Sequence, residues 1–308
     1  RAILRVYVIA AYKALDGLIC VYKPAGVPVR QVQHTIVTNL CRDLNALPYR
    51  DVEQRVEIVG ATNSQMSVRL IPNYADDPMV IGPRYQHEDF KCNYSTHLGL
   101  FTSGVLILGI NDGNRLKFRL HTARPTRAYK VQGKLGKATD TFFWNGKTVE
   151  RATFGHVTRE KLDRVIAHMQ AAHQQTMYKL SGLDMQSESL YELASKGVIR
   201  PANSKLPILY GIKCVHFQPP DFTLEVQAVN EYDHYLWAVV HDLGIQVKSA
   251  AYCTAVQCIR QGKFDLNLAL LRKHWQLNHI ASNIKQETWV YISCPNKKEH
   301  QQRPEHIL

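Results

Sequence analysis

Long apolar runs, paired cysteines and acidic residues are all scarce in this sequence. No apolar run exceeds the seven residues of Gly104–Ile110, whereas a membrane-spanning helix needs about 20, so we expect no membrane span. The seven cysteines are odd in number, scattered and never spaced as Cys-x-x-Cys. This pattern argues against a disulfide framework and a zinc site, and it favours a reducing compartment.

Several catalytic motifs are also missing. The chain has no Gly-x-Ser-x-Gly elbow, no phosphate-binding Walker loop and no Gly-x-Gly-x-x-Gly turn, which excludes the common hydrolase, NTPase and dinucleotide-binding classes. The histidine pairs His168/His173 and His274/His279 are five residues apart, so neither pair shares a helix face as metal ligands do. The sequence therefore predicts no metal and no cofactor.

Basic residues, by contrast, are in excess. The 308 residues include 38 Lys and Arg against 26 Asp and Glu, which gives a net charge of +12. Such a balance indicates a polyanionic partner, either nucleic acid or an acidic membrane surface. The length fits about two domains, or one large domain with an insertion.

Three segments are expected along the chain. Residues 1–15 form a short basic extension, residues 16–284 form the globular body with a helical insertion at about 155–200, and residues 285–308 form a polar extension. Such polar ends are typical of segments that order against a partner.

Apolar periodicity predicts a mixture of strands and helices. Strands are expected at Leu18–Tyr22, Val105–Ile110, Tyr129–Gly133, Leu209–Phe217 and Phe222–Val229, the last two joined by a Pro219-Pro220-Asp221 turn. Helical stripes fall at residues 32–44, 162–169 and 236–243, and Gly244 is predicted to cap the last helix. The fold class is α+β because strict βαβ alternation is absent.

A dense basic segment is the first candidate for a functional surface. Residues 114–139 contain eight Lys or Arg and no acid, interleaved with Phe118, His121 and Tyr129. Basic groups neutralise RNA phosphates and aromatic rings stack on unpaired bases. A solvated basic face without a partner is the alternative.

Several motifs occur in the order found in TruB-type pseudouridine synthases, which the chain resembles over Asp16 to Ile284. The matching stretches are Gly17–Val27, Leu98–Leu106, Ala128–Val131, Leu135–Thr141, Ser189–Gly197, Leu224–Val226 and His241–Gly244. Residues 157–164 and 269–284 look most like the mitochondrial branch, which lacks the C-terminal RNA-binding PUA domain. The resemblance implies the pseudouridine synthase fold, a central mixed or antiparallel sheet flanked by helices without a PUA domain, and a mitochondrial matrix location.

This chain departs from the family at the catalytic position. The family uses an Asp on the ribose C1′ side of the uridine glycosidic bond, and the matching residue here is Gly99, which offers neither nucleophile nor base. The Arg that pairs with that Asp in the family is replaced by Trp237, which we expect to fill the cleft. Rescue by Asp89, Asp112 or Asp140 carries little weight, because Asp112 and Asp140 are typical turn residues.

Of two further family positions, one is retained and one is replaced. Tyr129 stands where the family's Tyr stacks on the flipped base, with a core aromatic as an equal alternative. A late Arg-Arg pair reads Gln257-Cys258, which leaves Arg260 as the nearby charge. The expected RNA-binding residues are Lys23, His97, Arg115, Arg119, Arg124, Arg127, Lys130, Lys134, Lys137 and Arg260, although the turn alone suffices to explain Lys23.

Three hypotheses follow from these observations. The leading one is a catalytically inactive homologue that binds structured RNA, most plausibly rRNA during assembly of the large mitochondrial ribosomal subunit, with other assembly proteins as partners. The second is an active synthase that uses a displaced carboxylate. The third is a protein–protein scaffold with a vestigial RNA groove.

Overall fold

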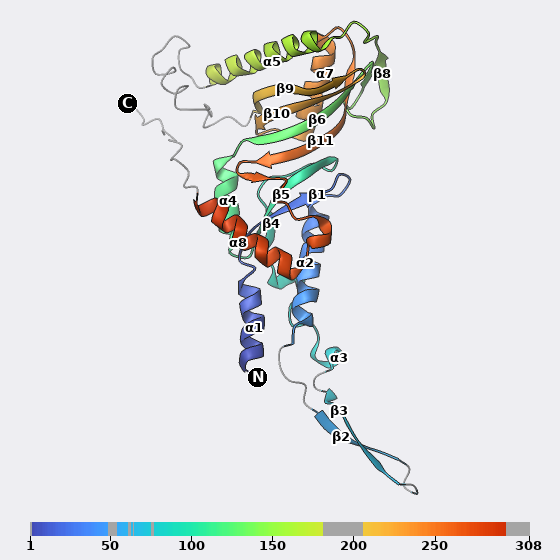
Figure 1. The fold of residues 1–308 in the computed structure, drawn as a ribbon, viewed down its shortest axis with the longest axis vertical. Helices are drawn as coiled ribbons and strands as arrows, with labels where there is room; N and C mark the ends of the chain where they lie inside the picture. The colour runs from blue at the N-terminus through green and yellow to red at the C-terminus, as the bar shows by residue number, and fades with distance from the viewer. Residues whose placement is uncertain are drawn as a thin grey trace, which may run out of the picture.

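The computed structural model describes residues 2–48, 54–60, 63, 65–74, 77–180 and 206–293. One sheet of eight strands dominates it, with helices packed around the sheet (Figure 1). The α+β class and the central mixed sheet are therefore confirmed. Along the sheet the order is β1 (Gly17–Lys23), β5 (Thr102–Ile110), β11 (Ala251–Gln261), β6 (Arg127–Leu135), β10 (Asp221–Val229) and β9 (Ile208–Gln218), with β4 (Cys92–Tyr94) beside β5 and β12 (Phe264–Asp265) beside β11.

All five expected strands are present, and β5 lies between β1 and β11 in the sheet. β1 runs antiparallel to β5, with Cys20 opposite Ile107, whereas β11 runs parallel to β5, with Val256 opposite Thr102. β1 and β5 are nearly continuously buried, which is typical of strands covered on both faces. β9 and β10 form the predicted antiparallel hairpin.

The expected helices are also confirmed. α2 (Val29–Ala46) buries the predicted stripe of Val32, Ile36, Leu40 and Leu44. The remaining helices are α1 (Ala2–Lys13), α3 (Pro78–Ile81), α4 (Gly113–Ala123), α5 (Arg159–Leu180), α7 (Asp233–Gln246) and α8 (Leu277–Ser293), together with the 3₁₀ turns η2 (His87–Asp89) and η3 (Arg272–His274).

The predicted cap at Gly244 is wrong. Gly244 lies inside α7, which continues to Gln246. A Cβ at Gly244 would lie only 2.7 Å from the Cβ of Ala251, so the glycine permits α7 to approach the start of β11. The left-handed residue after the helix is Lys248, with φ of 63°.

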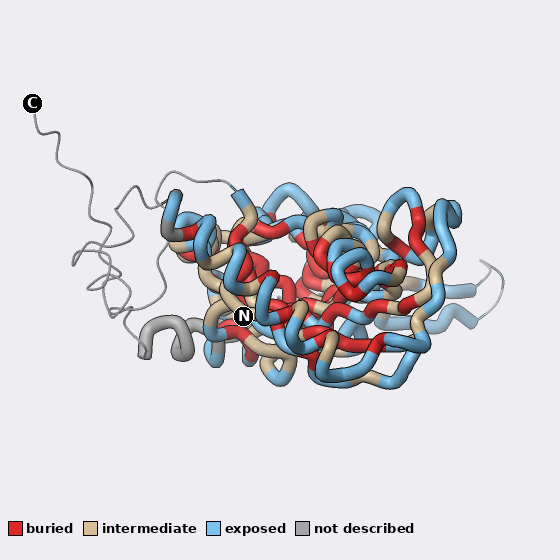
Figure 2. The backbone as a smooth tube through the Cα atoms, turned by 90° about the horizontal axis from the view of Figure 1, so that it is seen from above, coloured by how far each residue is buried: buried red, intermediate tan, exposed pale blue. Residues whose placement is uncertain are grey.

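One hydrophobic core joins the sheet to its helices. Buried residues run through the middle of the molecule and exposed ones form its outer surface (Figure 2). Trp275 is 2% exposed, and its Nε1 donates a hydrogen bond to the carbonyl of Leu270 at 3.0 Å. Asn283 on α8 accepts the Cys20 N–H at 2.9 Å. The body therefore closes around β1 with residues from both ends of the described chain.

Two small hairpins lie outside the main sheet. β2 (Gln54–Val59) pairs with β3 (Ser67–Pro72), and β7 (Lys137–Thr139) pairs with β8 (Thr148–Arg151). The first hairpin projects from the end of the body (Figure 1) and carries apolar residues on its surface.

The expected segment boundaries fall within or beside helices. Residues 2–13 of the predicted N-terminal extension are helical, and α8 runs through residue 284 to Ser293. Within the expected insertion, α5 occupies residues 159–180, whereas residues 181–205 lie outside the described part. The Ser189–Gly197 motif therefore lies outside the described residues.

Candidate functional site

The space beside Gly99 is occupied by a carboxylate. A Cβ added to Gly99 would overlap Oδ2 and Cγ of Asp233 and would lie 2.7 Å from Oδ1. Gly99 precedes β5, whereas Asp233 is the first residue of α7, 134 residues later in the chain. Residue 99 thus offers bare backbone, and an acidic side chain from another element fills the space beside it.

The three acids considered earlier serve turns and caps instead. Asp89 Oδ2 accepts the Gln86 N–H at 2.8 Å. Asp140 Oδ1 accepts the Lys147 N–H at 2.8 Å, and Asp112 directly precedes α4. The turn assignments of Asp112 and Asp140 are confirmed.

Lys23 lies next to this site and is fully buried. Its ammonium donates hydrogen bonds to the carbonyls of Thr102 at 2.8 Å, Leu100 at 3.1 Å and Pro24 at 3.2 Å. Burial lowers its pKa to about 8, while the negative charge of Asp233 acts in the opposite direction. Buried in this way, the ammonium is held by backbone carbonyls, so the expectation that Lys23 contacts RNA is at odds with its position.

Lys23 should make stability depend on alkaline pH. An unfolded lysine has a pKa near 10.4, so between about pH 8 and 10.4 the unfolded chain binds more protons and stability contributed by Lys23 rises with pH. We expect the wild type to gain stability relative to Lys23→Met between pH 7.5 and 10, measured by urea unfolding. A constant difference between the two proteins would show that the ammonium is not destabilised by burial.

Trp237 packs into an aromatic cluster beside Asp233. Its indole stacks on Phe143 with ring centroids 4.5 Å apart and planes 20° apart. Phe142 stacks on His241, which lies on α7 like Trp237, with ring centroids 4.2 Å apart. The backbone of Phe142 has a left-handed φ of 61°, which is unusual for a bulky residue. The indole Nε1 is buried and has no hydrogen-bond partner among the described residues. The loop after β7 thus provides an aromatic wall for one face of α7.

Tyr129 is built into the core. It is only 2% exposed, and its hydroxyl donates a hydrogen bond to Glu231 Oε1 at 2.7 Å. Glu231 also forms an ion pair with Arg127, which is 5% exposed. Burial raises the pKa of Tyr129 well above its usual value. This position matches the core-aromatic alternative, and the base-stacking role of Tyr129 remains a prediction.

The structure does not bring the expected basic residues to one surface. Tyr129 and Gly133 lie on the face of β6 that α7 covers, since a Cβ at Gly133 would lie 2.9 Å from Val240. Side chains alternate along a strand, so Lys130 and Lys134 lie on the opposite face, where Lys134 is 3.9 Å from Asp221. Arg127 is buried against Glu231.

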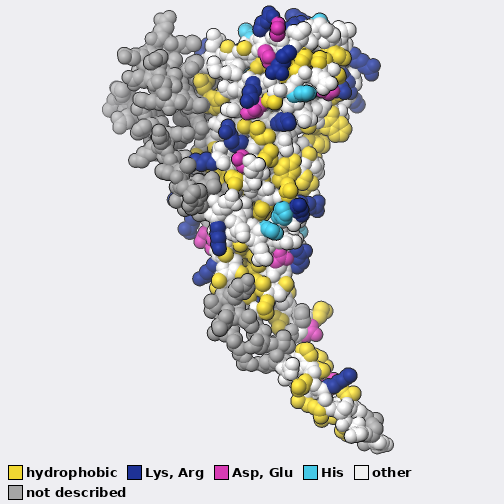
Figure 3. Space-filling view, viewed as in Figure 1, with side chains coloured by type: hydrophobic (Ala, Val, Ile, Leu, Met, Phe, Trp, Pro, Cys, Tyr) yellow, Lys and Arg dark blue, Asp and Glu magenta, His cyan; other side chains and the backbone are white. Residues whose placement is uncertain are grey.

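The remaining candidates are exposed or partly exposed. Arg115 and Arg119 are exposed on α4, on either side of Phe118, which is 64% exposed. Three other candidates, His97, Arg124 and Arg260, are also exposed. Lys137 is partly exposed, and its ammonium lies 5.1 Å from the centre of the Tyr252 ring. Lys and Arg side chains are spread over the body of the molecule (Figure 3).

Sequence reasoning missed two acids, Asp233 and Glu231. The signal for Asp233 was available, since it lies four residues before Trp237 and residues four apart share a helix face. Trp237 was already assigned to the cleft, so its neighbour one turn earlier belonged there too. For Glu231, nothing in the spacing indicated Arg127 as its partner.

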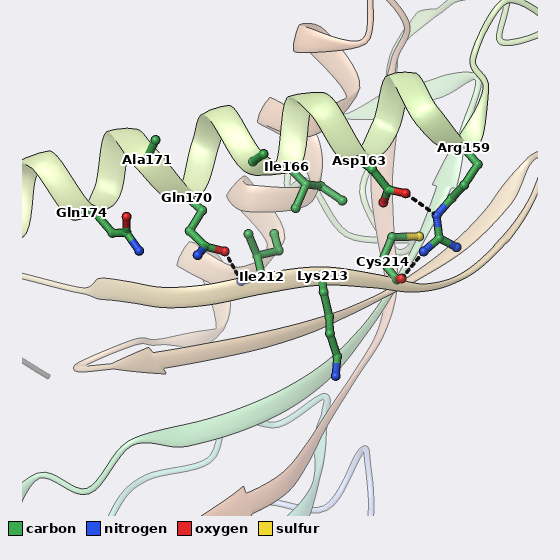
Figure 4. A pocket seen from close by; sticks show the side chains of 10 residues that line it. Arg159, Asp163, Ile166, Gln170, Ala171, Gln174, Ile212, Lys213 and Cys214 are labelled. Carbon is green, nitrogen blue, oxygen red and sulfur yellow. Dashed lines mark hydrogen bonds and ion pairs between the residues drawn. The ribbon is translucent and has the colours of Figure 1, made fainter. Parts of the chain in front are cut away.

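A separate hollow between α5 and β9 contains none of the predicted site residues (Figure 4). There Arg159 binds the carboxylate of Asp163 at 2.8 Å and donates to the Cys214 carbonyl, and Gln170 accepts the Ile212 N–H at 3.2 Å. Arg159 and Gln170 thus form hydrogen bonds with backbone groups of β9, which is the edge strand of the sheet. We interpret the hollow as protection of an exposed strand edge.

No group of three or more potential ligands that could hold a metal ion occurs in the described residues. Across the same part of the chain, no helix is long and apolar enough to cross a membrane.

Comparison with known proteins agrees with the resemblance. Residues 85–232 match the family model for the N-terminal domain of the TruB family pseudouridylate synthases. The chain is 39% identical to the mitochondrial pseudouridylate synthase TRUB2 of Xenopus tropicalis, over 89% of this chain and 86% of that protein. It is 38% identical to the TRUB2 of Homo sapiens, over 91% of this chain and 86% of that protein.

A solved structure is also similar. The crystal structure of the archaeal box H/ACA sRNP Nop10-Cbf5 complex matches with a TM-score of 0.48 at 13% identity, covering 89% of this chain and 60% of that one. The TRUB2 relatives, at 38–39% identity over most of the chain, confirm the expected mitochondrial location. The sequence motifs and these relatives together show that the chain belongs to the TruB family of pseudouridine synthases.

Proposed function

We propose that this chain binds structured mitochondrial RNA, and that α4 forms part of the binding surface. The observation that carries the proposal is the exposed combination of Arg115, Phe118 and Arg119 on α4, in a segment without any acidic residue from 114 to 139. Guanidinium groups neutralise phosphates and an exposed ring stacks on an unpaired base. Family membership supports RNA as the polyanion.

Ribosomal RNA of the large subunit is the first candidate ligand, with other assembly proteins as neighbours. A protein that holds a folded RNA during assembly needs an extended basic surface, and the spread of Lys and Arg over this body supplies one (Figure 3). The inactive-homologue hypothesis rested on an empty catalytic position. Because Asp233 fills that space, we propose that the chain binds RNA and do not propose that it is catalytically inactive.

Salt dependence tests the proposal. Replacing both Arg115 and Arg119 with Ala should weaken RNA binding and reduce the slope of log affinity against log salt by about 2, since each lost phosphate contact removes about one unit. Affinity for mitochondrial rRNA fragments would be measured by fluorescence anisotropy at several salt concentrations.

The control is the double variant Arg42→Ala, Arg164→Ala. It removes the same two positive charges as the α4 variant, but from α2 and α5. Arg42 is exposed and paired with Asp43, and Arg164 is exposed on α5. An unchanged slope in the α4 variant would favour the protein–protein scaffold instead.

A further inference from the structure

The carboxylate of Asp233 lies where a residue-99 side chain would begin. A Cβ built on Gly99 overlaps Oδ2 and Cγ of Asp233. In an aspartate at position 99, the Cγ would lie about 1.5 Å beyond that Cβ, one carbon–carbon bond away. A carboxylate delivered from α7 therefore reaches nearly the same place as one delivered from the segment before β5.

A buried cation accompanies this carboxylate. The Lys23 ammonium bonds to the carbonyls of Leu100 and Thr102, in the segment that directly follows Gly99. Burial is the larger influence on the pKa of Lys23, and the negative charge of Asp233 acts in the opposite direction. Lys23 is thus a buried cation that holds the backbone directly after Gly99, the residue against which the Asp233 carboxylate lies.

Two side chains close in sequence to Gly99 and Asp233 each have a buried polar atom without a partner among the described residues. Trp237 lies one helical turn after Asp233, and its buried Nε1–H has no partner among the described residues. The hydroxyl of Thr102 is likewise buried and unpartnered in the described part of the chain. Buried donors without partners cost stability, and a ligand's acceptors would offset that cost only where neighbouring side chains move to admit them.

We propose that Asp233 is the catalytic carboxylate of this chain and acts on a uridine in structured RNA, with Lys23 as its positioning residue. The proposal deepens the proposed function and rests on it, because the uridine must arrive as part of a bound RNA. An acid at a helix N-terminus is also favourable for the helix dipole, and the experiment below separates that structural role from catalysis.

The reaction is redox-neutral and needs no co-reactant. Asp233 Oδ attacks C1′ and forms an ester while the C1′–N1 bond breaks, and the bonding pair leaves on the uracil. After the uracil turns, C5 attacks C1′, the ester C1′–O bond breaks and its pair returns to the carboxylate. C5 then releases its proton to solvent and N1 takes one up, which gives pseudouridine.

Tritium release measures this step directly, because the C5 hydrogen is lost. The substrate is RNA transcribed from a mitochondrial genome with [5-³H]UTP, and the full chain is used. We expect tritium release by the wild type and a loss of about a thousandfold or more in Asp233→Asn. RNA affinity of the variant should stay within about twofold of the wild type, which also shows that it folds.

The matched control is Asp242→Asn, an exposed acid on the same helix, which should retain release. RNA binding by the wild type without tritium release would overturn the catalytic role of Asp233 while leaving the proposed function intact. Undiminished release by Asp233→Asn would also overturn it. Absence of RNA binding by the wild type would overturn both proposals.

Discussion

Replacement of Arg127 by Met is expected to lower the free energy of unfolding by about 3–5 kcal/mol. Arg127 and Glu231 form an ion pair in which the side chains are 6% and 0% exposed. Removing the guanidinium leaves a carboxylate buried with only the Tyr129 hydroxyl as a described hydrogen-bond donor. An uncompensated buried charge is among the few single changes with so large an effect. Urea unfolding monitored by circular dichroism would measure it.

Two further variants test the cause. Lys130→Met, an exposed residue on the same strand, should change stability by no more than about 0.5 kcal/mol. The double variant Arg127→Met, Glu231→Leu removes both charges and should recover most of the loss. A loss below about 1 kcal/mol in Arg127→Met would mean that the pair is not isolated from water.

Gly99→Ala should displace the carboxylate of Asp233. The new methyl group would overlap Oδ2 and Cγ of that side chain, so one of the two groups must move. Overpacking of this kind typically costs about 1–3 kcal/mol. A displacement of about 1 Å at a catalytic group can cost on the order of a hundredfold in rate. We therefore expect a moderate loss of stability together with a hundredfold slower release of tritium from labelled RNA.

Gly155→Ala is the matched control, because a Cβ at Gly155 meets nothing within 4 Å. It should leave both stability and tritium release unchanged. Normal stability and normal release in Gly99→Ala would contradict the placement of Asp233 beside Gly99.

A count of charged residues predicted the charge of the basic segment at residues 114–139 but not the location of each side chain. Its charge was correctly read from the sequence, but the structure divides it among a helix surface, one face of β6 and the core. Arg127 and Lys130 are only three residues apart, yet the first is buried against Glu231 and the second is exposed. Alternation along a strand gives opposite faces, but it does not say which face a helix will cover.

Strands and helices were largely predictable because their apolar periodicity is local. The stripe of α2 and the alternation of β10 each reflect contacts that repeat every few residues. β11 was missed as an element, and Gly244 was assigned to a helix end. For Gly244 the deciding contact is the packing of α7 against the start of β11, which local periodicity does not contain.

The sequence alone determined the family, the strand and helix pattern and the absence of an acid at position 99, because each depends on residue identity and local spacing. Only the tertiary structure decided what occupies the space beside Gly99. Asp233 reaches it from 134 residues further along the chain, since packing of α7 against β11 places the helix N-terminus there. Local periodicity contains no information about such a distant approach, which depends on how the whole core closes.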